Sequence, residues 1–388
     1  MADRAKDTII CISGNGNTVS SSENAARRML VATTEGVLDF RRDGPGADWQ
    51  LQDGLLLPGN HVSCLVYDER NDLLFAGMHF DGGLLMSRDR GATWEKRDAG
   101  VASGHAYTLL VQYDGDRTIL NLGTEPVMFY RSWDLGESWT AFPSCTQVEG
   151  TEHWIFPRSQ PHIKHIAAHP SEPETLYICV EQGDLLKTTD GGHTWTSLHS
   201  MERADDKFRR DQHRVVFYRT PNEIFFTTGI GLYHTTDAGE SWERLTDPSH
   251  PCGYPDPFFV HPTKDKLFMQ GAGGNPNPGW AAEGTAHPQF MVSTDHGKSW
   301  VQKMEGMAHP VRGNLEIAAM HDSVEGGLEF YSGSAVGELY VSRDEGESWT
   351  FATGALPPMS KGPHFRWFLT PEDREAYENK LRGMNAFA

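Results

Sequence analysis

The sequence predicts a seven-bladed β-propeller, and three observations lead to that prediction. The pattern Ser/Thr-x-Asp-x-Gly-x-Ser/Thr-Trp occurs six times, and a degraded seventh copy, Asp43–Trp49, precedes them. The seven Trp residues follow one another at steps of 45, 45, 56, 47, 58 and 49 residues, which suits one four-stranded blade per step. Short apolar runs flank each copy, as in a β-hairpin. The complete copies are Ser87–Trp94, Ser132–Trp139, Thr188–Trp195, Thr235–Trp242, Ser293–Trp300 and Ser342–Trp349.

The repeated pattern has the chemistry of a tight turn. Aspartate accepts hydrogen bonds from backbone amides, glycine adopts positive φ, and the tryptophan packs beneath the hairpin. A turn that closes every blade needs the same chemistry each time. We therefore interpret the seven aspartates as structural and exclude them from the candidate site.

This pattern is the Asp-box, and the chain resembles the Asp-box (BNR-repeat) propellers, which include sialidase-like folds, sortilin-type receptors and photosystem assembly factors. The segments Gly123–Pro126, Val180–Gly183 and His165–Pro170 are most similar to soluble bacterial propellers labelled sialidase or glycosyl hydrolase because of their boxes. The resemblance implies the fold. Sialidase activity is not implied, because the chain lacks the Arg-Ile-Pro element of sialidases and Phe156–Arg158 is out of place for it.

Each repeat predicts strands A, B and C, the box, and strand D, with all strands antiparallel. In the second blade these are His61–Tyr67, Leu73–Gly77, Leu84–Met86 and Trp94–Lys96. Because strand direction alternates, the A-to-B turns and the boxes share one rim, here called the box rim. The other connections share the opposite connection rim. The long segments 143–163, 248–257 and 271–288 lie there, so we expect any chemistry on that side.

The two chain ends are expected to complete the first blade. Thr8–Ser13 and Phe365–Leu369 both resemble strands, and one of them is predicted to pair beside Met29–Thr34 and close the ring. A short helix is predicted over about 371–382, because Thr370 is a suitable N-cap and Pro371 and acidic residues follow it. The ring uses residues 1–388 as a single domain.

Composition excludes several classes of partner. The formal net charge of −19 argues against nucleic acid and anionic membrane surfaces. The N-terminus lacks the apolar segment of a signal peptide, and no stretch is long and apolar enough for a membrane helix. The five cysteines show no close pairing. A cytoplasmic location is expected, and the oligomeric state is left open.

Four histidines stand at the start of strand A in four consecutive blades. Strand A is innermost, so these side chains are expected to surround the mouth of the central channel and hold a divalent metal, Zn, Fe or Cu. The alternative is that each is a hydrogen-bonded polar residue in a wet funnel. The predicted ligands are His61, His105, His165 and His213.

Carboxylates and arginines on the connection rim complete the predicted site. Glu125 and Glu181 are candidates for a ligand, a general base or a residue that orients an imidazole. Candidates for substrate binding are Arg158, Asp256, Arg312 and Arg366.

The main functional hypothesis is a metal-dependent hydrolase or lyase that acts on a small polar molecule in the funnel. Two alternatives remain open at this stage. One is a non-catalytic assembly or binding propeller. The other is a metal-free glycosidase or polysaccharide lyase that uses Glu125 and Glu181 as its acid and base pair.

Overall fold

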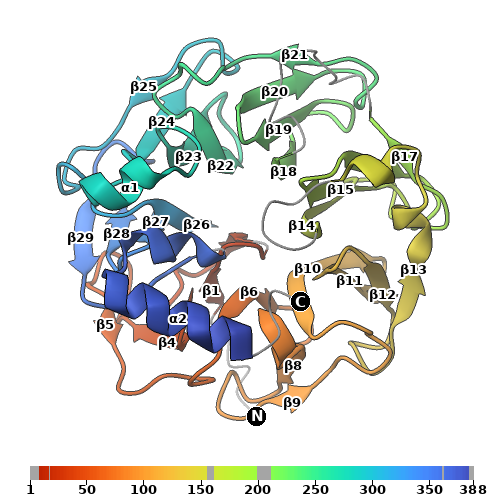
Figure 1. Ribbon diagram of the computed structural model, residues 1–388, viewed down its shortest axis with the longest axis horizontal. Helices are drawn as coiled ribbons and strands as arrows, with labels where there is room; N and C mark the ends of the chain where they lie inside the picture. Colours follow the sequence, from red (N-terminus) through yellow and green to blue (C-terminus); the bar gives the residue numbers. More distant parts are fainter. Residues whose placement is uncertain (1–7, 17, 155–160, 199–210, 361, 384–388) are drawn as a thin grey trace.

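Seven small sheets stand around one axis in the computed structural model, which describes residues 8–16, 18–154, 161–198, 211–360 and 362–383 (Figure 1). This confirms the predicted propeller. Blades 1 to 4 contain β1 (Ile9–Ile12), β3 (Arg28–Thr33), β4 (Gly36–Arg41) and β5 (Gln50–Leu51); β6 (Val62–Asp68), β7 (Leu73–Met78), β8 (Leu84–Ser87) and β9 (Glu95–Lys96); β10 (His105–Asp114), β11 (Arg117–Glu125), β12 (Phe129–Ser132) and β13 (Thr140–Phe142); and β14 (His162–Ala168), β15 (Leu176–Glu181), β16 (Leu185–Thr188) and β17 (Thr196–Ser197).

The remaining three blades repeat the same order from the axis outward. They contain β18 (Gln212–Phe217), β19 (Ile224–Thr228), β20 (Gly231–Thr235) and β21 (Glu243–Arg244); β22 (Tyr254–Val260), β23 (Leu267–Ala272), β24 (Gln289–Ser293) and β25 (Val301–Gln302); and β26 (Leu315–Ser323), β27 (Gly327–Ser334), β28 (Leu339–Ser342) and β29 (Thr350–Thr353). Apolar side chains fill the space between neighbouring blades. Between blades 6 and 7, for example, the rings of Phe268 and Phe330 lie 4.4 Å apart.

Each complete Asp-box forms the same turn, in which the aspartate accepts hydrogen bonds from its own hairpin. In blade 7, Asp344 accepts from the hydroxyl of Ser342 at 2.8 Å and from the amide and hydroxyl of Ser348 at 2.9 and 2.6 Å. Glu345 and Gly346 follow with φ of 59° and 80°. The other five boxes repeat these bonds. The structural interpretation of the boxes is therefore confirmed.

Replacing one box aspartate is expected to weaken the blade without affecting the axis. Asp344→Ala removes all three acceptor contacts and should lower the free energy of unfolding by about 1–2 kcal/mol. Asp344→Asn keeps one carbonyl acceptor and should lose less. Urea unfolding of both variants measures the difference, and an Ala variant as stable as the wild type would contradict this account of the turn.

Side chains of one blade bond to the box of the next. In four places a side chain donates a hydrogen bond to the backbone carbonyl of the residue that follows the box aspartate. The donor and acceptor pairs are Arg28 with Arg90, Arg131 with Gly191, Tyr177 with Ala238, and Lys266 with Glu345. These contacts connect blades that share no sheet hydrogen bonds.

The N-terminal segment closes the ring from the inside. Strand β1 is the innermost strand of blade 1 and runs parallel to β3, whereas the innermost strands of blades 2 to 6 are antiparallel to their neighbours. The chain then returns as β2 (Val19–Ser22), which pairs in parallel with β26 of blade 7. Between these strands, Asn15 bonds to Ser63 of blade 2, and its carbonyl accepts from Thr108 of blade 3. The predicted pairing of Thr8–Ser13 beside Met29–Thr34 is thus confirmed.

The seam between blades 1 and 7 also carries a buried ion pair. The two Nη atoms of Arg42 donate to the carboxylate of Glu329 at 2.7 Å each, and the exposed fractions of the two side chains are 0% and 3%. Because both charges are covered, each depends on the other for stabilisation.

The C-terminal segment lies on the connection rim. The predicted strand Phe365–Leu369 is wrong, because Pro363–Phe368 forms a 3₁₀ helix, η5. The predicted terminal helix is confirmed as α2 (Pro371–Gly383), which Thr370 caps through a bond from the amide of Asp373. The long loop of blade 6 contains the short helix α1 (Pro278–Glu283), and Trp280 of this helix stacks on Phe368. Figure 1 shows α1 near blade 6 and α2 over blade 1, and η5 contacts both helices.

The five cysteines are buried and free, which agrees with the absence of pairing in the sequence. Among the described residues, no helix has the length and apolar character needed to span a bilayer.

Candidate functional site

The innermost strands of six blades contain a β-bulge at the same position, near the connection rim. Strand pairing shifts register between residues 62 and 64, 106 and 108, 163 and 165, 212 and 214, 255 and 258, and 315 and 317. A bulge inserts an extra residue and redirects its side chain. The inserted residues are Ser63, Tyr107, Lys164, His213, Asp256 (with Pro257) and Glu316. We call these six side chains the polar collar.

Lys164 connects the collar across the axis. Its ammonium group donates to Asp256 of blade 6 at 2.8 Å and lies 2.9 Å from Glu181 of its own blade. Blades 4 and 6 are not neighbours, since blade 5 lies between them. A direct bond between their innermost strands therefore places these groups at the axis. The exposed fractions of the three side chains are 5% or less.

Electrostatics keep the groups of this cluster charged. Burial alone would raise the pKa of Glu181, but Lys164, followed by His162, holds that pKa well below its ordinary value. Burial likewise opposes the charge on Lys164, and Asp256 and Glu181 together raise its pKa. Glu181 is therefore a carboxylate, and Lys164 is an ammonium ion, at neutral pH.

A second pair of groups adjoins Glu181. Asp211 directly precedes β18, and its carboxylate lies 3.5 Å from Nε2 of His213. Nδ1 of His213 lies 2.6 Å from the carbonyl oxygen of Pro255, and a carbonyl can only accept, so Nδ1 carries a hydrogen. A neutral ring would then point a lone pair at the carboxylate. Asp211 and His213 thus face each other at ion-pair distance.

Glu181, Asp211 and His213 form one compact group. One oxygen of each carboxylate and one nitrogen of the imidazole all lie within 4.8 Å of one another, and all three side chains are buried. Burial alone would raise the pKa of Asp211, but the charge interaction and the hydrogen bond with His213 outweigh this and lower the pKa overall. The group combines two carboxylates with an imidazole, and these residue types serve in acid and base chemistry.

The C-terminal segment covers the other side of the collar. Glu316 accepts a hydrogen bond from the Ser360 hydroxyl at 3.0 Å and lies 3.3 Å from His364. Nε2 of His61 in turn lies 3.2 Å from the Ser360 carbonyl. This part of the collar is therefore occupied by the chain itself.

The four predicted metal ligands occupy different surroundings. His61 contacts the C-terminal segment, and half-buried His105 packs against Phe80 with ring centres 5.7 Å apart. His165 accepts a hydrogen bond from the Val215 amide, whereas His213 belongs to the collar. Among the described residues, the one group with ligand-sized spacing contains His213 but none of the other three. Metal binding itself stays a prediction that no finding tests.

The other predicted residues divide into those near the cluster and those away from it. Glu181 and Asp256 lie in the Lys164 cluster, and Glu125 is 3.4 Å from His162, which separates it from Glu181. Arg312 is exposed ahead of β26, and Arg366 lies in η5, where its guanidinium is 6.0 Å from the Trp367 ring. Arg158 lies outside the described residues.

Sequence reasoning missed Lys164 and Asp211. Both adjoin positions that it considered, because Lys164 precedes His165 and Asp211 stands two residues before His213. The signal that could have pointed to Lys164 is a lysine beside Ile163 in a predicted innermost strand. His165 was selected in its place because it stands at the start of strand A, and the bulge that gives Lys164 its position could not be predicted.

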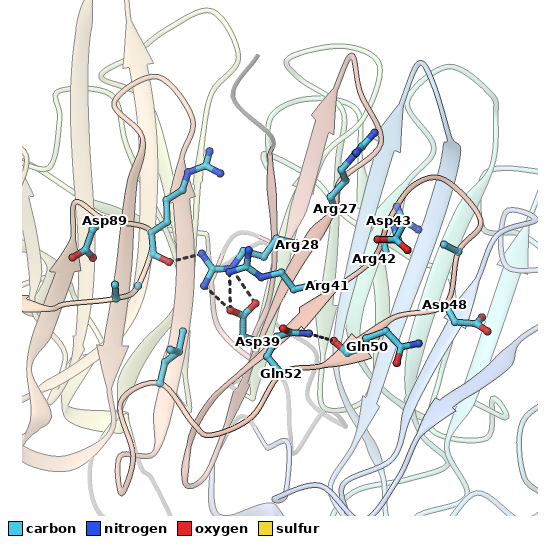
Figure 2. Close-up of a pocket in the computed structure, with 15 residues that line it drawn as sticks. Arg27, Arg28, Asp39, Arg41, Arg42, Asp43, Asp48, Gln50, Gln52 and Asp89 are labelled. Carbon is cyan, nitrogen blue, oxygen red and sulfur yellow. Dashed lines mark hydrogen bonds and ion pairs between the residues drawn. The ribbon is translucent and has the colours of Figure 1, made fainter. Parts of the chain in front are cut away.

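A larger groove on the box rim is less suited to chemistry. It lies between blades 1 and 2 with a volume of about 1040 Å³, and Figure 2 shows Arg28 and Arg41 both directed at Asp39. Arg28 donates to this carboxylate at 2.9 and 2.8 Å, and Arg41 donates at 3.1 Å. The buried Arg42 is held by Glu329. The buried cations of this groove are therefore neutralised by neighbouring carboxylates.

Comparisons with known proteins give related propellers. An oligoxyloglucan-reducing end-specific xyloglucanase of Emericella nidulans is 21% identical over 288 residues, which cover 65% of this chain and 34% of the enzyme. The chloroplastic photosystem II stability/assembly factor of Arabidopsis thaliana is 36% identical over 103 residues, which cover 26% of this chain and 24% of that protein. The crystal structure of a GH74 enzyme from Niastella koreensis superposes with a TM-score of 0.59 at 18% identity over 88% of this chain and 55% of that chain.

These similarities establish the fold. The chain spans about a third of the length of the xyloglucanase of Emericella nidulans, 34%. No family model matches the chain, so the resemblance to Asp-box propellers is not confirmed as family membership.

The comparisons overturn the main functional expectation. A metal-dependent hydrolase or lyase acting on a small polar molecule is not supported, because the matched relatives include xyloglucanases, whose substrate is a polysaccharide, and a photosystem II assembly factor. The metal-free and non-catalytic alternatives fit these relatives better.

Proposed function

We propose that this protein is a metal-free glycoside hydrolase that cleaves a polysaccharide at the blade 4 and blade 5 side of the polar collar. The observation that carries the proposal is the spacing of Glu181 and Asp211, whose carboxylate oxygens lie within 4.8 Å beside His213. The two carboxyl groups of retaining glycosidases are about 5–5.5 Å apart, against about 6.5–9.5 Å in inverting enzymes. The spacing favours a retaining reaction.

Each group of the cluster has a role in this reaction. Glu181, which Lys164 keeps ionised, attacks or stabilises the anomeric carbon. Asp211 and His213 together supply the proton for the leaving oxygen. Asp211 thus takes the place that the sequence hypothesis gave to Glu125, because His162 stands between Glu125 and Glu181.

Release of reducing ends from polysaccharides tests the proposal. Xyloglucan is the first substrate, since four matched relatives are named for it, and other neutral and acidic polysaccharides complete the panel. We expect product to form at the same rate with and without EDTA. Activity that EDTA removes and a divalent cation restores, or no product from any polysaccharide, would refute the proposal.

A second candidate is a non-catalytic binding propeller. It is favoured by the segment that is 36% identical to the photosystem II stability/assembly factor. Saturable binding of an intact polysaccharide or peptide without any product would identify this function in the same panel.

A further inference from the structure

A separate cavity lies on the axis on the far side of the polar collar from the connection rim. Its volume is about 340 Å³, and its walls are the innermost strands β10, β14, β18, β22 and β26, together with Gly16 and Val19 of the N-terminal segment. We call it the axial cavity. None of its lining residues is an aspartate or a glutamate, although the chain carries 53 acidic residues and a net charge of −19.

Arg214 is a cation of this cavity without a counterion. The residue is 5% exposed and lines the axial cavity. Its guanidinium makes no hydrogen bond or ion pair with any residue in the described ranges, and Nε is fully covered without a partner. Buried guanidinium groups are normally paired, because leaving a charge unpaired in a protein interior is costly.

The acids closest to Arg214 are already used by another cation. The charge of Asp256 acts on Arg214 from beyond ion-pair distance. The Asp256 carboxylate instead accepts from Lys164 at 2.8 Å, and Lys164 also holds Glu181. Burial lowers the pKa of Arg214, and Asp256 only partly opposes this effect. Lys164 therefore pairs with both acids, and among the described residues neither acid forms an ion pair with Arg214.

His165 contributes a second donor to the same cavity. Its Nδ1 accepts from the Val215 amide at 3.5 Å, so the hydrogen of the neutral ring is on Nε2. Burial, followed by the charge of Arg214, holds the pKa of His165 well below its ordinary value, so the ring is neutral. No described residue accepts a hydrogen bond from Nε2. A guanidinium and an imidazole N–H thus line one cavity that offers no carboxylate.

We propose that the axial cavity binds a small oxyanion, a carboxylate, phosphate or sulfate group, with the Arg214 guanidinium as its principal donor and His165 Nε2–H as a further donor. The planar fork of arginine fits two oxygens of such an anion. The bound anion supplies the negative charge that neutralises the Arg214 guanidinium. The site is distinct from Glu181 and Asp211, so it can exist in a protein with no hydrolase activity.

Isothermal titration calorimetry tests the site with inorganic phosphate, sulfate and acetate, each at constant ionic strength in a chloride buffer. We expect one anion per chain, and preference between acetate and the tetrahedral anions identifies the source chemistry. Arg214→Met should weaken binding by about 10–100-fold. The matched control is Arg219→Met, since Arg219 also lines the cavity but donates to the carbonyls of Pro262 and Lys264. Absence of saturable binding by all three anions, or unchanged binding by Arg214→Met, would overturn the proposal.

Thermal unfolding in the chloride buffer gives an independent test. If Arg214 lacks a counterion, Arg214→Met removes an unpaired buried charge, and its melting temperature should equal or exceed that of the wild type. Phosphate or the preferred anion should then raise the melting temperature of the wild type but not of the variant. A variant that unfolds earlier than the wild type in chloride, or does not fold, would show that Arg214 has a structural partner and would overturn the proposal.

Discussion

Glu181→Gln is expected to lower the turnover number for polysaccharide hydrolysis by roughly 10²–10⁴-fold. The amide is close in shape to the carboxylate, but it neither attacks nor accepts a proton. Lys164 keeps its bond to Asp256, so the cluster retains one of its two acid partners. Initial rates of reducing-end release, measured under saturating substrate, give the ratio directly. The Michaelis constant should change much less than the turnover number.

The matched control for this variant is Glu329→Gln. Glu329 is also a buried glutamate in an ion pair, with Arg42, but it lies at the seam between blades 1 and 7. Its replacement should lower stability by a similar amount and leave turnover unchanged. If Glu329→Gln lost as much activity as Glu181→Gln, the effect would come from general destabilisation. Full activity in Glu181→Gln would remove this residue from the reaction.

Lys164→Met should be among the most destabilising single substitutions in the chain. It leaves Glu181 and Asp256 buried without their cation, and breaking a buried ion pair in this way costs about 3–5 kcal/mol. Lys96→Met is the control, because the side chain of Lys96 is 65% exposed and its pair with Asp98 should contribute at most about 1 kcal/mol. Urea unfolding at pH 7 measures both.

The loss in Lys164→Met should depend on pH. In the wild type the folded-state pKa of Glu181 is lowered, so its contribution to stability is present above the unfolded-state value, about 4.3, and disappears as pH falls through the folded-state pKa. Without Lys164, burial raises that pKa, and protonation then relieves the unpaired charge. The gap between variant and wild type should narrow from pH 7 to below pH 4. A gap that is constant with pH would contradict the ionised state assigned to Glu181.

The fold was predictable because the hydrogen bonds of the repeated turn are made between residues of the same short segment. Asp344, Gly346 and Ser348 make their bonds within eight residues of chain, and the pattern around them recurs in six blades. The closing strand Ile9–Ile12 was also recognisable from its apolar run. Its parallel direction was not, because direction depends on a partner, β3, that the local sequence does not specify.

The site was less predictable because its geometry depends on register. The first residues of strand A were expected at the mouth of the channel, and this selected His165. An inserted residue changes the face of the strand to which the following side chains point, and the bulge gives Lys164 the bond across the axis. Glu181 and Asp256 both lie in the Lys164 cluster, and the roles predicted for them stay predictions.

Pairing of β2 with β26 joins Val19 to Met320, so a ribosome has to make most of the protein before β2 can find its partner. Blades 2 to 6 contain mainly neighbouring contacts and can fold as they emerge. Strand β2 cannot pair until β26 has been synthesised, and contacts of such large sequence separation form slowly. Closure of the ring is therefore a late step in folding. Until it occurs, the innermost edge of β26 has no strand partner and is open to aggregation.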